Sequence, residues 1–117
     1  MVDPDYSDVQ FIRGFILYKL YTYHYWVRPK GRPLGHTSVK NIPKGYPRLD
    51  LRGKVEAEID SLRKMGLVST FKHAGDAELH VSDVLDAKCI EQGLPICNFY
   101  AEAVGLPALD RRLMPIE

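Results

Sequence analysis

Between residues 28 and 54 the chain concentrates positive charge. This segment holds eight of the protein's 16 Lys and Arg residues and a single acid, Asp50. The eight bases are Arg28, Lys30, Arg32, Lys40, Lys44, Arg48, Arg52 and Lys54. Clustered ammonium and guanidinium groups are typical of surfaces that bind phosphate, because they pair with its oxygens. The segment therefore predicts a surface for a polyanion, although charge alone also permits a merely solvated loop.

No pattern in the sequence predicts catalysis. The histidines are His24, His36, His73 and His80. They are scattered. A hairpin could bring His73 and His80 together, but no third histidine or cysteine stands beside them. Phosphate loops, nucleophile elbows and paired catalytic carboxylates are absent. Cys89 and Cys97 are eight residues apart, which leaves both buried thiols and a disulfide open. We expect no enzyme, no catalytic residues, no metal site and no cofactor.

The composition describes one ordinary domain. The chain has 117 residues, of which 45 % are hydrophobic, and a formal net charge of +1. Such a chain is long enough to bury a core. Its first residues, MVDPDYSD, are acidic and polar, unlike a signal peptide, and no window approaches the roughly 18 apolar residues of a membrane span. We therefore expect a soluble, cytoplasmic protein without membrane contact.

Residues 7–27 predict a long first helix with two apolar faces, capped by Ser7 or Asp8. One face carries Val9, Ile12, Ile16, Leu20, Tyr23 and Val27. The other carries Phe11, Gly14, Tyr18, Tyr21 and Tyr25. Two apolar faces need cover on both sides, from the rest of the chain or from a second subunit. The run TYHYW also suits a strand, so the helix can alternatively end near Tyr21.

Two further helices are expected around the basic residues. Ser38 is a good N-cap for a short helical turn, which Pro43 and Pro47 prevent from continuing. Asp50 is a good N-cap for the next helix, and Gly66 is placed to end it in the left-handed conformation. The stripe of this helix that should be buried consists of Val55, Ile59, Leu62 and Met65.

After Gly66, where the helix that begins at Asp50 ends, the hydrophobic period changes from helical to alternating. Residues 67–72 and 77–81 predict two short strands, joined at Gly75 into a hairpin. The order of helix, short helix, tight turn, helix and hairpin is that of a winged helix-turn-helix. We therefore expect an α+β, mostly α fold, with a winged helix-turn-helix core in residues 1–82 and a helical extension in residues 83–117 packed on the same domain.

The extension itself predicts two short helices. One begins with Ser82 as its cap, and the other runs from Asn98 to Gly105. Pro95 and Pro107 should separate the pieces, since proline cannot continue a helix without losing a hydrogen bond.

One motif in the basic segment is more specific than its charge. It reads His-Thr-Ser, then Asn, a Pro-Lys-Gly-Tyr-Pro corner, Arg-Gly, and a helix that ends in Leu-x-x-x-Gly-Leu. Its residues are His36, Thr37, Ser38, Asn41, Pro43, Lys44, Gly45, Tyr46, Pro47, Arg52, Gly53, Leu62 and Gly66. This stretch resembles a family of small stand-alone winged-helix proteins of archaea, over about residues 12–82. The resemblance implies a winged helix-turn-helix fold and a nucleic-acid-binding role, but no particular target.

The resemblance weakens in the predicted wing. Only Gly75, Val81 and Ser82 match the family there, so it implies no wing contacts. The residues after Ser82 match no pattern of the family.

Together these features predict binding of double-stranded DNA in transcriptional regulation, through the basic segment and the start of the second helix. Since such proteins commonly pair on DNA, we also expect a homodimer with Phe11, Tyr18, Tyr21 and Tyr25 at or beside the interface. The outer face of the helix that follows Asp50 carries acids, which repel phosphate. The alternative is therefore a protein-interaction module, possibly within an RNA-containing complex.

Overall fold

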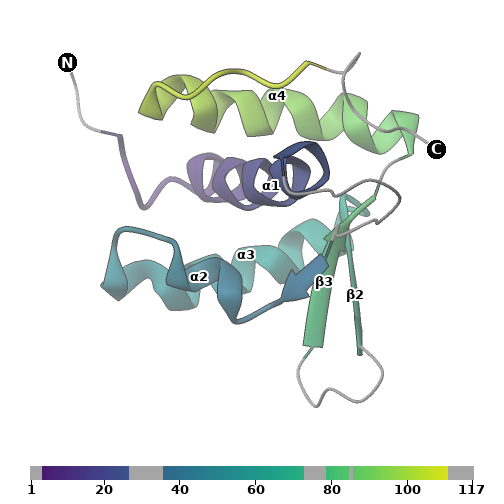
Figure 1. Ribbon diagram of the computed structural model, residues 1–117. Helices are drawn as coiled ribbons and strands as arrows, with labels where there is room; N and C mark the ends of the chain where they lie inside the picture. The colour runs from purple at the N-terminus through teal and green to yellow at the C-terminus, as the bar shows by residue number, and fades with distance from the viewer. Residues whose placement is uncertain (1–3, 27–35, 73–78, 85, 111–117) are drawn as a thin grey trace.

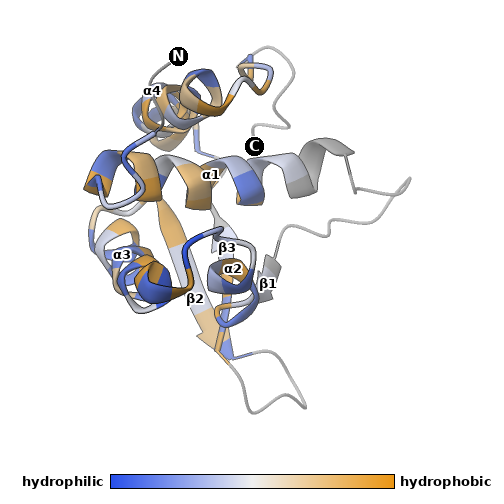
Figure 2. Ribbon diagram, turned by 90° about the vertical axis from the view of Figure 1, so that its left-hand side faces the viewer, coloured by the Kyte–Doolittle hydropathy of each residue, from blue (hydrophilic) through white to orange (hydrophobic). Residues whose placement is uncertain are grey.

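The chain folds into three layers (Figure 1). The structure, a computed structural model, describes residues 4–26, 36–72, 79–84 and 86–110. Its helices are α1 (Val9–Trp26), α2 (Asn41–Lys44), the 3-10 turn η1 (Leu49–Leu51), α3 (Arg52–Lys64) and α4 (Ala87–Val104). Its strands are β1 (His36–Ser38), β2 (Val68–Lys72) and β3 (Leu79–Asp83). Helix α4 lies on one side of α1, and α2, α3 and the strands lie on the other (Figures 1 and 2). The predicted class, α+β and mostly helical, is confirmed.

Helix α1 is covered on both sides, as its two apolar faces require. Ile12, Ile16 and Leu20 are fully buried, and so are Leu17 and Tyr21. The helix continues to Trp26 and does not end at Tyr21. The alternating aromatic residues therefore follow the helical period here, because tertiary packing on two sides outweighs their preference for strands.

The second face of α1 is covered by α4 of the same chain. Phe11 is 2 % exposed, and its ring lies edge-on to Tyr100 of α4, with 5.1 Å between the centroids. The Tyr18 hydroxyl donates a hydrogen bond to the Pro107 carbonyl oxygen at 3.2 Å. The side chain of Tyr25 is outside the described part of the structure. The apolar face that suggested a subunit interface is thus occupied within one chain, and the homodimer stays a prediction.

Helix α3 has the predicted buried stripe with one exception. Val55, Ile59 and Leu62 are buried, whereas Met65 is 45 % exposed. The assignment of Met65 to the core was wrong because the helix ends at Lys64, and Met65 lies at the edge of the stripe just beyond that end. Gly66 has a φ of 80°, as expected for the residue that ends a helix.

The predicted caps of α2 and α3 were wrong. Ser38 belongs to β1, and Lys40 is the residue before α2. Asp50 lies inside η1, where its carboxylate pairs with Arg48 and caps nothing. Serine and aspartate have several local partners of similar energy, so a good capping residue does not by itself fix the start of a helix.

The strands form one antiparallel sheet in the order β1–β3–β2. In β3, Val81 pairs with Thr37 of β1 on one side and Thr70 of β2 on the other. Strand β1 was not predicted, because the sequence around it reads as a loop. The hairpin was predicted correctly, although β3 begins at Leu79, and the turn with Gly75 lies outside the described residues.

The predicted break in the C-terminal extension was also wrong, because α4 is one continuous helix that contains Pro95. Asp86 caps it by accepting a hydrogen bond from the Lys88 N–H at 2.8 Å, and Ser82 pairs in β3 instead. Pro95 is exposed, while Ile90, Gly93, Cys97 and Ala101 are buried. Burial of this stripe offsets the hydrogen bond that proline removes.

The helix ends at Gly105, whose φ is 75°, as predicted. Within the described residues, no helix combines the length and apolarity needed to cross a membrane.

Candidate nucleic-acid interface

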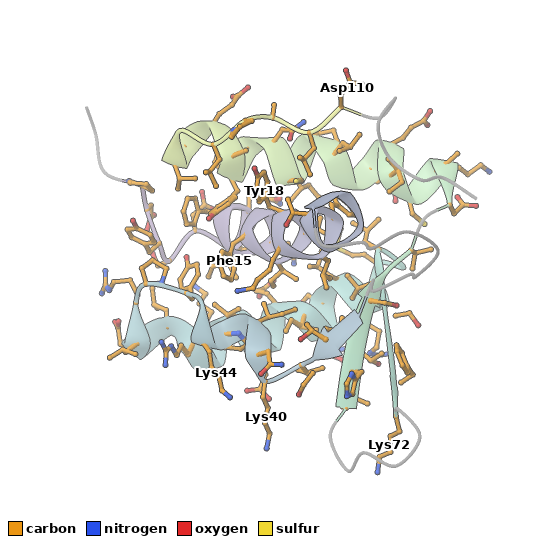
Figure 3. The ribbon with its side chains drawn as sticks, viewed as in Figure 1. Phe15, Tyr18, Lys40, Lys44, Lys72 and Asp110 are labelled. Carbon is orange, nitrogen blue, oxygen red and sulfur yellow. The ribbon has the colours of Figure 1, made fainter. Side chains whose placement is uncertain are left out.

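Two of the predicted binding residues, Lys40 and Lys44, are exposed at the two ends of α2. Both project from the side of the molecule opposite α4 (Figure 3). Among the described residues, neither ammonium group has an ion-pair partner. They are therefore available to an anionic ligand without breaking an internal contact.

The other described bases of the segment already have partners. The Arg48 guanidinium donates to both carboxylate oxygens of Asp50, at 3.1 and 3.0 Å, and this hydrogen bonding lowers the pKa of Asp50. Arg52 Nη2 donates to the Lys44 carbonyl oxygen at 2.9 Å. Lys54 Nζ donates to the Ser7 carbonyl oxygen at 2.8 Å. Arg28, Lys30 and Arg32 lie outside the described residues.

Tyr46, the aromatic residue of the corner motif, anchors this region on α1. Its side chain is 1 % exposed, and its ring lies 4.9 Å from that of Phe15 and 5.9 Å from that of Tyr6. Its hydroxyl donates to the Tyr6 carbonyl oxygen. Burial raises the pKa of Tyr46, so the hydroxyl stays a donor over the physiological range.

Gly45, beside Tyr46, lies against a side chain of α1. Lys19 of α1 extends over this glycine, with its Nζ 5.7 Å from the centre of the Phe15 ring. A Cβ at position 45 would displace the flexible end of that lysine. The corner thus fits closely against α1, and its apolar anchor leaves the lysines of α2 on the outside.

The acids on α3 are largely compensated by neighbouring bases. Asp60 accepts hydrogen bonds from Arg63 and lies 3.3 Å from Lys64 Nζ, and these contacts lower the pKa of its carboxyl. Glu58 forms an ion pair with Arg13 of α1 at 2.8 Å. The repulsion that acids on this helix exert on phosphate is therefore weaker than the sequence suggests.

A hollow of about 190 Å³ lies between α3 and the hairpin. Its lining residues are Val39, Glu56, Ile59, Asp60, Arg63, Thr70 and Leu79. Leu79 is 44 % exposed at its edge. The hollow combines an apolar floor with charged groups of both signs.

Lys72 is a candidate binding residue that sequence reasoning did not select. It is exposed at the end of β2 and points to the same side of the molecule as Lys40 and Lys44 (Figure 3). Its position just before the predicted turn of the hairpin could have indicated an exposed cation. The acids in the same hairpin balance its charge, so the charge count alone does not identify it.

The histidines, cysteines and acids that could bind a metal or react form no site among the described residues. Among the described residues, no three His, Cys, Asp or Glu side chains gather in a way that could hold a metal ion. Cys89 and Cys97 are both free thiols. Burial raises the pKa of Cys97 to about 12, so this thiol is unreactive in the folded protein. His73 lies outside the described residues.

Comparisons of the chain with protein families, with curated proteins and with solved structures gave no match.

Proposed function

We propose that the protein is a winged helix-turn-helix that binds double-stranded DNA, and that it serves transcriptional regulation. The observation that carries this proposal is the pair of exposed lysines at the two ends of α2. Lys40 and Lys44 project from one side of the molecule together with Lys72 of the hairpin (Figure 3). These three cations, which have no ion-pair partner among the described residues, favour a polyanion with regularly spaced charges, and duplex DNA is such a ligand.

The arrangement of the elements supports the same proposal. The helices α1, α2 and α3 are followed by a hairpin, and the sheet order β1–β3–β2 places the hairpin beside the short strand that precedes α2. In a winged helix-turn-helix, α3 would be the recognition helix. The face of α3 turned away from the core carries Gly53, Ala57, Asp60 and Lys64, all exposed.

Salt dependence is the direct test, because phosphate contacts release counterions. Three contacts predict a log–log slope of about −2.7 between affinity and salt concentration. Lys40→Gln and Lys44→Gln should each flatten this slope by about one. Fluorescence anisotropy with a labelled mixed-sequence duplex measures both quantities.

Lys88→Gln is the matched control for these variants. Lys88 is also an exposed lysine, but it belongs to α4, in the layer farthest from α2 (Figure 1). Its substitution should change neither affinity nor slope. If the parent protein binds no duplex at low salt, or if Lys88→Gln weakens binding as much as Lys44→Gln does, the proposal is wrong.

The hollow between α3 and the hairpin supports a second candidate, a protein-interaction module. Leu79 is an apolar side chain left exposed beside that hollow, and Glu56 and Asp60 are acids on its rim. Such a surface suits a peptide better than it suits phosphate. A chain that binds neither DNA nor RNA, and in which Leu79→Ser disrupts a complex isolated with the protein, would favour this second function.

A further inference from the structure

Arg52 is chemically similar to Arg48, but the structure places the two side chains very differently. The Arg48 side chain is 52 % exposed and pairs with Asp50. Arg52 is half-buried and directs Nη2 to the carbonyl oxygen of Lys44. We infer that Arg52 is a positioning residue that acts on the ligand through Lys44, and that it does not itself contact phosphate. This inference rests on the proposed DNA binding.

The two ends of α2 are held by different contacts. At its N-terminal end, the Asn41 side chain donates to the Thr37 hydroxyl at 3.0 Å, which ties the helix to β1. At its C-terminal end, Arg52 of α3 donates a hydrogen bond to the Lys44 carbonyl oxygen, in addition to the packing of the buried Ile42 in the core. Hydrogen bonds therefore tie the Lys40 end of α2 to β1 and the Lys44 end to Arg52.

The chemistry of a helix end explains why an arginine is used here. The last carbonyl groups of a helix have no partner within the helix and are partly negative. Arg52 supplies a cationic donor to the last of them, that of Lys44. Its Nε is buried and makes no hydrogen bond within the described residues. Turning the guanidinium outward to a phosphate would leave the Lys44 carbonyl without this donor and release the end of α2.

The free protein provides the first test. The N–H groups of Gly45 and Tyr46 close the last turn of α2, through bonds to the carbonyl oxygens of Ile42 and Pro43. Arg52→Met should raise the hydrogen-exchange rates of these two amides by about tenfold. Arg48→Met removes the same charge from the same corner and should leave them unchanged.

A second variant keeps the test valid if Arg52→Met does not fold. Arg52→Lys retains the charge, but its ammonium ends short of the position of Nη2. Exchange at Gly45 and Tyr46 should rise in this variant as well. A role based on charge alone predicts that Arg52→Lys behaves like the parent, and such a result would overturn the inference.

Binding to a labelled duplex provides the second test. Arg52→Met should weaken binding about fivefold in the parent and in Lys40→Gln, but less than twofold in Lys44→Gln, because its effect passes through Lys44. Equal losses in all three backgrounds, with the salt slope flatter by one each time, would show a phosphate contact by Arg52 and overturn the inference. If the parent binds no duplex, the proposed function fails, and the exchange rates alone decide whether Arg52 holds α2.

Discussion

The α1–α4 contact and the corner formed by α2, η1 and the start of α3 are built by different means. Between α1 and α4, small residues let the helices approach closely: a Cβ on Gly14 would lie 2.6 Å from the Cβ of Tyr100. In the corner, long side chains reach backbone carbonyls, and a Cβ on Gly53 would meet nothing within 4 Å. Close packing of small residues therefore holds the first region together, whereas hydrogen bonds to carbonyl groups orient the long side chains of the second.

The largest effect should come from the two glycines themselves. Gly14→Ala should destabilise the protein by about 1–3 kcal/mol, because the methyl group would also press on the Ile96 carbonyl oxygen, a backbone atom that cannot turn away. Gly53→Ala should instead stabilise by about 0.4–1 kcal/mol, through a lower entropy of the unfolded chain. Urea denaturation measures both, and a stable Gly14→Ala variant would remove the basis of the comparison.

The ion pair between α1 and α3 and the ion pair within the corner differ in how far they are buried. Glu58 and Arg13 pair where their side chains are only 12 % and 21 % exposed. Glu58→Ala should cost about 1–2 kcal/mol, since it leaves a half-buried guanidinium without its partner. Asp50→Ala breaks the exposed pair with Arg48 and should leave the melting temperature unchanged.

Between pH 9 and pH 10, the pH dependence of stability should report on α4 rather than on the corner, because the raised pKa of Tyr46 affects stability only above its ordinary value of 10.0. Burial raises the pKa of the Cys97 thiol from 9.0 to about 12. The unfolded chain releases this proton at lower pH than the folded chain, so stability is complete below pH 9 and falls from there towards pH 12. The slope should approach about 1.4 kcal/mol per pH unit.

Cys97→Ala identifies the part of this slope that the thiol causes. In guanidinium titrations between pH 8.5 and pH 10, about the range where tyrosines contribute least, this variant should show a flatter slope than the parent. An unchanged slope would assign the pH dependence to other groups.

The smallest effect concerns the outer face of α3. Asp60→Asn should release Arg63 and Lys64, which the carboxylate now holds. Under the proposed function, affinity for a duplex should rise and the salt slope should steepen by at most about two. Glu91→Gln removes one negative charge from α4, a different helix, and should change the slope little. Weaker binding by Asp60→Asn would show that the carboxylate itself contributes to recognition.

Sequence predicted those features that depend on repeated patterns. The stripe of α3, the hairpin, and the glycines that end α3 and α4 were found because period and left-handed geometry are local properties. The cap of α1 was predicted correctly, since the Asp8 carboxylate accepts a hydrogen bond from the Gln10 N–H at 2.9 Å. The caps of α2, α3 and α4 and the break at Pro95 were predicted wrongly, because packing of α4 on α1 and pairing within the sheet outweighed these local signals. Strand β1 was missed because a three-residue strand has no period of its own.

In the candidate site, too, the sequence predicted only part of the arrangement. The charge count identified the corner, but it did not separate Lys40 and Lys44 from Arg52 and Lys54. The latter two donate to carbonyl groups 8 and 47 residues away in the chain. Which way a long flexible side chain turns depends on such distant acceptors, and composition carries no information about them.

The cover of α1 by α4 has a consequence for synthesis of the protein. Helix α1 ends at Trp26 and α4 begins at Ala87, so 60 residues, 27–86, lie between them. At translation rates of about 5–20 residues per second, the ribosome needs roughly 3–12 seconds to proceed from one helix to the other. During that interval the face of α1 that packs on Tyr100 lacks its cover by α4. The nascent protein therefore presents to chaperones an apolar surface that the finished protein conceals.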